Sequence, residues 1–165
     1  MIFRRVAILA MPNRVPSPRT SMSPDPISVV LELERRINSR DPGSILDLLS
    51  PDSVFIDSLG SRVRGLEKLR AAWQGYFKMV PDYGISHDEV FNHGDTVAMF
   101  GSARGTYSPD GQIRKENFWT TTAAWRASVR DGKIALWQVF ADNEPIRVVM
   151  RRIAEQDKST RGQTR

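Results

Sequence analysis

The feature that most constrains the fold of this chain is a change in the spacing of its apolar residues near residue 80. Before that point, apolar side chains recur every three or four positions, which is the period of an amphipathic helix. From about residue 83 to residue 141 they follow four strand-like stretches, separated by short turns. The chain is therefore expected to place helices first and an antiparallel sheet second, as an α+β domain.

Three helices are predicted in the first half. Asp25-Pro26 and Asp41-Pro42 each combine an N-cap residue with a proline suited to the first helical position. A third helix is expected to open after Gly65 and to stop before Pro81. Its apolar residues form one stripe, which consists of Leu66, Leu69, Trp73, Tyr76, Phe77 and Val80.

Five strands are predicted, of which one short strand, Val54–Asp57, lies between the second and third helices. The four long strands are expected over about 83–91, 96–107, 117–129 and 134–141. They are apolar on both faces in places, whereas antiparallel sheets with one wet face alternate more cleanly. A curved sheet explains this pattern, with the helices on its concave face and a second subunit or the termini on its convex face.

The charge of the chain lies at its two ends. The formal net charge is +5, but residues 1–25 and 151–165 each contribute a net +3, and the stretch between them is nearly neutral. Nucleic-acid-binding domains usually gather basic residues on a folded face, so no nucleic-acid partner is expected. No run of about 18 apolar residues occurs, so no membrane span is expected either.

The two ends also define the predicted domain boundaries. Residues 1–24 are expected to form a disordered, basic, proline-rich leader, because the apolar run Val6–Met11 is short and five prolines follow it. A cleaved export signal and a true start at Met22 are the alternatives. The folded domain is predicted over 25–147, and a basic tail over 148–165. The absence of cysteine excludes disulfides and thiolate sites, and it fits a reducing, cytoplasmic location.

Several local motifs occur in a characteristic order along residues 26–145. They are Asn38–Asp41, Leu48–Val54, Arg64-Gly65, Val80–Asp82 and Asp131–Ile134 followed by Trp137. With the predicted order of elements, they resemble the superfamily of nuclear transport factor 2, ketosteroid isomerase and the SnoaL-like polyketide cyclases. The resemblance implies a cystatin-like, cone-shaped fold, in which three N-terminal helices pack on the concave face of a curved, largely antiparallel sheet. It also implies a pocket without a cofactor or metal, and a homodimer.

Asp57 is the first candidate for chemistry. The resemblance places it where ketosteroid isomerases have their general base. A carboxylate at the rim of an apolar cavity loses hydration, which raises its pKa and makes it a competent proton shuttle. The alternative is an aspartate at a strand end that accepts backbone hydrogen bonds in the turn before Gly60.

Two specific activities of the superfamily do not fit the sequence. The isomerase's first-helix tyrosine is replaced by Leu33, and its partner aspartic acid is missing from Thr122–Trp125. The epoxide hydrolases carry an aspartate on the last strand, and this chain has Val139 at that position. They also carry an arginine–aspartate pair, and the matching segment here, Phe100–Ala103, contains neither residue. Neither a strict steroid isomerase nor an epoxide hydrolase is therefore expected.

Asp142 and His87 are the other predicted catalytic residues. SnoaL-type cyclases carry an acid four residues after a tryptophan like Trp137, whereas Asp142 is five residues after it and would point to the opposite face without a bulge. The alternative is a cap for Asn143–Pro145. His87 lies within a strand and could act as an acid, base or donor, or be a surface or structurally bonded histidine. His87 and His93 are not spaced as a metal pair.

Aromatic and sulfur side chains are predicted to line the pocket. These substrate-binding candidates are Trp73, Tyr76, Phe77, Met99, Trp119, Trp125 and Trp137. They suit a small, hydrophobic, carbonyl-bearing ligand, although some of them are expected to be ordinary core.

Two functions are open on this evidence. The first is a cofactor-independent isomerase, cyclase or dehydratase that uses Asp57 as general base. The second is a non-catalytic ligand-binding or dimeric accessory module of the same fold.

Overall fold

The computed structural model describes residues 24–162 of the chain. The predicted leader, apart from Pro24, therefore lies outside the described residues, as does Met22. The elements are, in chain order, α1 (Pro26–Ser39), α2 (Pro42–Leu46), β1 (Leu49–Ile56), β2 (Arg62–Arg64), α3 (Leu66–Met79), β3 (Gly84–His93), β4 (Thr96–Thr106), the 3-10 turn η1 (Lys115–Asn117), β5 (Phe118–Arg130), β6 (Lys133–Ala141) and α4 (Glu144–Gly162).

The first two helices begin where the Asp-Pro pairs predict. The carboxylate of Asp25 accepts a hydrogen bond from the backbone N–H of Ser28 at 3.0 Å. Asp41 caps α2 in the same manner, through the N–H of Gly43 at 2.9 Å. Each cap satisfies a backbone donor that has no partner within the first helical turn.

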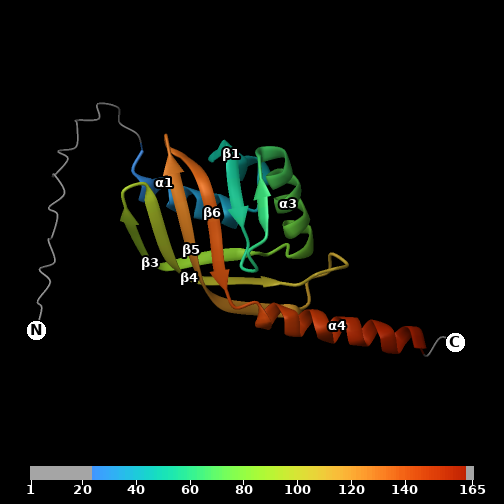
Figure 1. The fold of residues 1–165 in the computed structure, drawn as a ribbon. Coiled ribbons are helices and arrows are strands. Elements are labelled where there is room, and N and C mark those ends of the chain that lie inside the picture. The colour runs from blue at the N-terminus through green and yellow to red at the C-terminus, as the bar shows by residue number, and fades with distance from the viewer. Residues whose placement is uncertain (1–23, 163–165) are drawn as a thin grey trace, which may run out of the picture.

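The described strands form one open, six-stranded sheet in the order β2-β1-β6-β5-β4-β3. All neighbours pair antiparallel except β1 and β6, which run parallel. Figure 1 shows the sheet curving, with α1 and α3 lying against one face of it. The expected α+β class, with helices on the concave face of a curved mixed sheet, is thus confirmed.

The core fills the space between these helices and the concave face of the sheet. Val30 and Leu33 of α1 are almost fully buried there, and so are Met99 of β4, Trp125 of β5 and Ile134 of β6. One continuous core therefore fixes the helices against the strands that carry the candidate site.

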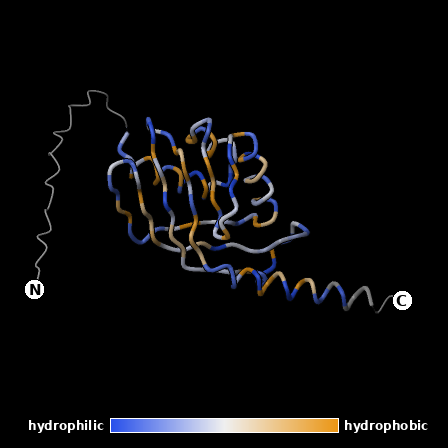
Figure 2. Tube along the Cα trace, in the orientation of Figure 1, coloured by the Kyte–Doolittle hydropathy of each residue, from blue (hydrophilic) through white to orange (hydrophobic). Residues whose placement is uncertain are grey.

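A fourth helix, α4, occupies the region where only a basic tail from residue 148 is predicted. Ile146, Val149, Met150 and Ile153 recur at helical spacing, and the Oδ1 atom of Asp142 accepts the backbone N–H of Glu144 at 2.8 Å. Hydrophobic and hydrophilic residues alternate along α4 in Figure 2, and the helix runs outward past the end of the sheet. No helix within residues 24–162 is both long enough and apolar enough to cross a membrane.

Candidate functional site

A cavity of about 570 Å³ opens between the concave face of the sheet, helix α3 and the first turns of α4. Its walls come from α1, β1, β2, α3, β4, β5, β6 and α4, and its rim comes from the turn after β1 and the segment that links β6 to α4. Pockets of this volume accommodate drug-sized ligands. The cavity is therefore large enough for a molecule with several rings.

Aromatic side chains line the cavity together with aliphatic and polar ones. Five of the seven predicted substrate-binding residues line the cavity, namely Trp73, Tyr76, Trp119, Trp125 and Trp137. The rings of Trp125 and Trp137 stack with their centroids 6.3 Å apart. Stacked and tilted rings of this kind present a rigid, apolar surface to a flat ligand.

The other two predicted lining residues do not reach the cavity. Phe77 stacks behind Trp73 on α3, with the ring centroids 5.3 Å apart. Met99 is fully buried in the core between the helices and the sheet, and it does not line the cavity. Apolar spacing identified both as inward-facing residues, but it did not distinguish the cavity wall from the packed core.

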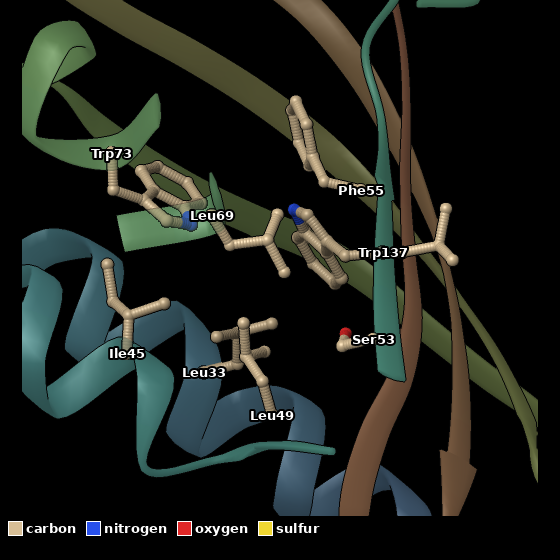
Figure 3. Close-up of a pocket in the computed structure, with 9 residues that line it drawn as sticks. Leu33, Ile45, Leu49, Ser53, Phe55, Leu69, Trp73 and Trp137 are labelled. Atoms are coloured by element: carbon tan, nitrogen blue, oxygen red, sulfur yellow. The ribbon is translucent and has the colours of Figure 1, made fainter. Parts of the chain in front are cut away.

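A much smaller hollow of about 10 Å³ adjoins the cavity and shares Phe55, Leu69, Trp73 and Trp137 with it. Figure 3 shows side chains from α1, α2, α3 and the sheet converging here, with Ser53 supplying a hydroxyl group. This space holds one water molecule at most. The hollow thus marks the closed, tightly packed side of the cavity.

Asp57 follows β1, and its half-buried side chain lines the cavity. The backbone N–H groups of Leu59 and Ser61 both donate to its Oδ1 atom, each over 2.9 Å. No hydrogen bond from another residue of the described chain engages Oδ2. One carboxylate oxygen therefore holds the turn, and the other is left to interact with a ligand.

Asp142 also lines the cavity, although its position five residues after Trp137 predicts the opposite face. Strand β6 ends at Ala141, so the alternation of faces no longer applies at residue 142. Its Oδ1 atom caps α4 through Glu144, as the alternative interpretation expects. Both candidate carboxylates are thus exposed or half-buried residues of rim turns.

The two rim turns are joined by hydrogen bonds. The Ser58 hydroxyl and the Asn143 side-chain amide bond to each other, at 3.0 Å from the hydroxyl to Oδ1 and 2.8 Å from Nδ2 to the hydroxyl. This pairing holds Asp57 and Asp142 at the same side of the cavity. Arg147, one turn into α4, adds a cation to the same rim.

His87 lies outside the cavity. Its Nδ1 atom is 2.7 Å from Oε2 of Glu34 on α1, so the imidazole joins α1 to β3. His87 shares the strand parity of buried Ile85. Helix α1 packs against this part of β3, however, and Glu34 of α1 pairs with the imidazole ring. The geometry matches a structurally bonded histidine, which the sequence left open as an alternative.

Two parts of the cavity wall were missed by the sequence analysis. Tyr83, just before β3, is only 8% exposed and lines the cavity beside Tyr76. The first turns of α4 contribute Ile146, Arg147 and Met150. The available signals were the strand parity that Tyr83 shares with Ile85 and the helical spacing of apolar residues after residue 145.

The buried tyrosines act as neutral groups. Burial raises the pKa of Tyr76 and of Tyr83 above the usual value of a phenol. Each therefore keeps its proton at neutral pH and can donate a hydrogen bond. Within residues 24–162, no cluster of three or more histidine, aspartate or glutamate side chains is arranged to hold a metal ion.

An open, curved sheet with helices on its concave face and an apolar cavity between them defines the ketosteroid isomerase-like, or NTF2-like, fold. The model of the SnoaL-like domain matches residues 30–137, and the chain belongs to that family. A search of curated proteins gives no match.

Solved structures agree with this assignment of the fold. A candidate SnoaL-like polyketide cyclase from Shewanella denitrificans has a TM-score of 0.66 and 15% identity, over 76% of this chain and 96% of that one. IdmH, a candidate polyketide cyclase from Streptomyces antibioticus, has a TM-score of 0.63 and 25% identity, over 76% and 97%. A Catenulispora acidiphila protein of ketosteroid isomerase-like fold, solved with trimethylamine, has a TM-score of 0.63 and 14% identity, over 72% and 88%.

Proposed function

We propose that this domain binds a small, hydrophobic, carbonyl-bearing molecule in the 570 Å³ cavity, and that Asp57 acts on it as a general base. The reaction is an isomerisation, cyclisation or dehydration that needs no cofactor. The observation that carries the proposal is the lining of the cavity, in which aromatic and aliphatic walls lead to a rim that carries a half-buried carboxylate with one oxygen free.

Asp57 is held in a geometry suited to proton transfer. Two backbone N–H groups bind Oδ1 and fix the orientation of the carboxylate, so that Oδ2 can accept a proton from the carbon beside the carbonyl. The electrons of the C–H bond then move into an enolate, and the same carboxyl group can return the proton at another position. A positioned base of this kind contributes about 10²–10⁴-fold in rate.

The other two candidate residues have different places in this proposal. Asp142 is a second carboxyl group on the same rim and can exchange protons with a bound ligand. His87 is left out of the mechanism, because its ring is paired with Glu34 outside the cavity.

The test is hydrogen–deuterium exchange of 2-tetralone, a bicyclic ketone whose C1 protons are acidified by both the carbonyl and the ring. In D₂O the protein is expected to accelerate loss of the C1 proton signal, measured by NMR. Asp57→Asn should lower this acceleration by about 10²-fold or more, whereas Asp88→Asn, which removes an exposed carboxylate of β3 outside the cavity, is the matched control and should retain most of it. Equal acceleration by wild type and Asp57→Asn would rule out Asp57 as the base.

A non-catalytic binding module is the second candidate function. It is favoured by the fact that Asp57 and Asp142 each have one oxygen engaged by a turn and that neither is fully buried. Saturable binding of 2-tetralone without any acceleration of exchange would identify this function.

We also propose that the protein is a cytoplasmic homodimer. The outer face of the sheet carries three exposed phenylalanines, Phe91, Phe100 and Phe140. Phe100 and Phe140 flank the small side chain of Ala124 in adjacent strands, and Phe91 contacts Phe100 with the ring centroids 6.3 Å apart. Apolar patches of this kind commonly mark protein interfaces. The cytoplasmic location rests on the absence of cysteine.

A further inference from the structure

We infer that the indole N–H groups of Trp73 and Trp137 hold the carbonyl oxygen of the ligand at the inner end of the cavity. The inference rests on the proposed ligand class, and it names the residues that recognise the oxygen of that ligand. Both rings line the cavity, one from helix α3 and the other from strand β6.

The two rings lie where the main cavity adjoins the small hollow. Trp73 and Trp137 line both spaces, and so does Phe55 of β1. Phe55 pairs with Trp137 across β1 and β6, and the centroid of its ring lies 6.0 Å from that of Trp73. Figure 3 shows the two ring nitrogens on the sides of the indoles that face each other. The two N–H groups therefore belong to facing walls of the same space.

Neither ring nitrogen has a hydrogen-bond partner among the described residues. Within 24–162, Nε1 of Trp119 is the one polar atom of a buried or half-buried side chain that is both enclosed and unpaired. The Nε1 atoms of Trp73 and Trp137 are thus unpaired but not enclosed. Trp137 is 4% exposed and lies on the cavity wall, so the open side of its nitrogen faces the cavity. An unpaired donor in such a place costs free energy, which a ligand oxygen would recover by accepting the N–H.

The tryptophan pair lies within one ligand's reach of the proposed base. Asp57 follows Phe55 by two residues, and two residues of fully extended chain span at most about 7 Å. In 2-tetralone the acidic carbon is bonded directly to the carbonyl carbon. One ligand can therefore place its oxygen at the indoles and its acidic C–H at Oδ2 of Asp57. The N–H groups then also stabilise the negative charge that develops on the oxygen as the enolate forms.

This arrangement selects the ligand by its inner end. A carbonyl oxygen has two lone pairs, one for each indole N–H. A hydrocarbon of the same shape fills the same space but leaves both donors unpaired. The cavity is thereby expected to prefer a ketone to the corresponding hydrocarbon.

The first experiment compares 2-tetralone with tetralin, which has the same two rings and no oxygen, in the ¹⁵N-labelled wild-type protein. The indole protons of Trp73 and Trp137 are expected to move further downfield with the ketone, because only the ketone accepts a hydrogen bond. Trp119 is the internal control, since its enclosed Nε1 should give the same shift with both ligands. The signals are assigned by their loss in Trp73→Phe, Trp137→Phe and Trp119→Phe.

Calorimetric titration measures the same preference as a ratio of affinities. Trp73→Phe and Trp137→Phe each remove one donor and are expected to lower the ratio of 2-tetralone affinity to tetralin affinity by about three- to tenfold. The loss of ring surface weakens the binding of both ligands and cancels in this ratio. Trp119→Phe is the matched control and should change the affinity for both ligands by the same factor.

Saturable binding of both ligands with equal indole shifts would overturn the inference and leave the proposed function intact. The same conclusion would follow if the Trp73 and Trp137 variants kept the wild-type affinity ratio, or if the ketone-specific shift occurred at Trp125 instead. Failure of the wild-type protein to bind either ligand would contradict the proposed function itself.

Discussion

At the scale of single residues, Asp57 has two separable tasks. Its Oδ1 atom holds the turn through Leu59 and Ser61, whereas Oδ2 is the oxygen proposed to take the proton. An asparagine keeps an acceptor oxygen for the turn and removes the base, while an alanine removes both. Structure and chemistry at this position can therefore be measured apart.

Asp57→Ala is expected to lower the free energy of unfolding by about 1–2 kcal/mol, since two backbone donors lose their shared acceptor. Asp57→Asn should lower it by less than half of that. Urea unfolding followed by circular dichroism measures both values. An equal loss in the two variants would mean that the negative charge, and not the acceptor geometry, stabilises the turn.

At the scale of elements, the close contact of β3 and β4 depends on a glycine. A Cβ atom at Gly101 would lie 2.0 Å from the backbone oxygen of Ser86 and 2.7 Å from Cα of His87, at the register shift between His87 and Glu89. Both clashes are with backbone, so β3 would have to move away.

Gly101→Ala is expected to lower the free energy of unfolding by about 1–3 kcal/mol through overpacking. Gly75→Ala is the matched control, because Gly75 lies within α3 with open space around its Cα. That change should raise stability by about 0.5–1 kcal/mol, the helix preference of alanine over glycine. If Gly101→Ala proved as stable as wild type, the bulged pairing described here would be wrong.

The elements also show what the sequence could predict. Asp25-Pro26 and Asp41-Pro42 encode helix starts locally, so both starts were predicted correctly. Helix α4 was missed because its charged residues outweighed the spacing of Ile146, Val149 and Ile153. Strand β2 has only three residues and exists through its pairing with β1, which no local pattern encodes.

The residues of the candidate site, like the elements of the fold, were predicted only where a local sequence pattern marks them. Periodicity identified inward-facing aromatic residues such as Trp125. It did not show which inward-facing side chains line the cavity, as Tyr83 does, and which fill the core, as Met99 does, because this depends on packing between distant segments. The pairing of His87 with Glu34 likewise joins residues 53 positions apart.

At the scale of the whole molecule, the two faces of the sheet have different proposed roles. The concave face binds the ligand, and the outer face binds a second subunit. Phe100→Glu is expected to convert the proposed dimer into a monomer, because it places a charge at the centre of the apolar outer face. Light scattering after size-exclusion chromatography should give twice the mass of one chain for wild type and a single chain for the variant. A monomeric wild-type protein would contradict the dimer.

The four tryptophans provide the most direct test of the central claim, which is that the cavity binds a hydrophobic carbonyl compound. All four line the cavity, and the chain contains no others. In a ¹⁵N-labelled sample titrated with 2-tetralone, the indole N–H signals are predicted to shift along saturable curves that share one dissociation constant. Indole signals that stay in place, or that drift linearly without saturation, would contradict the account.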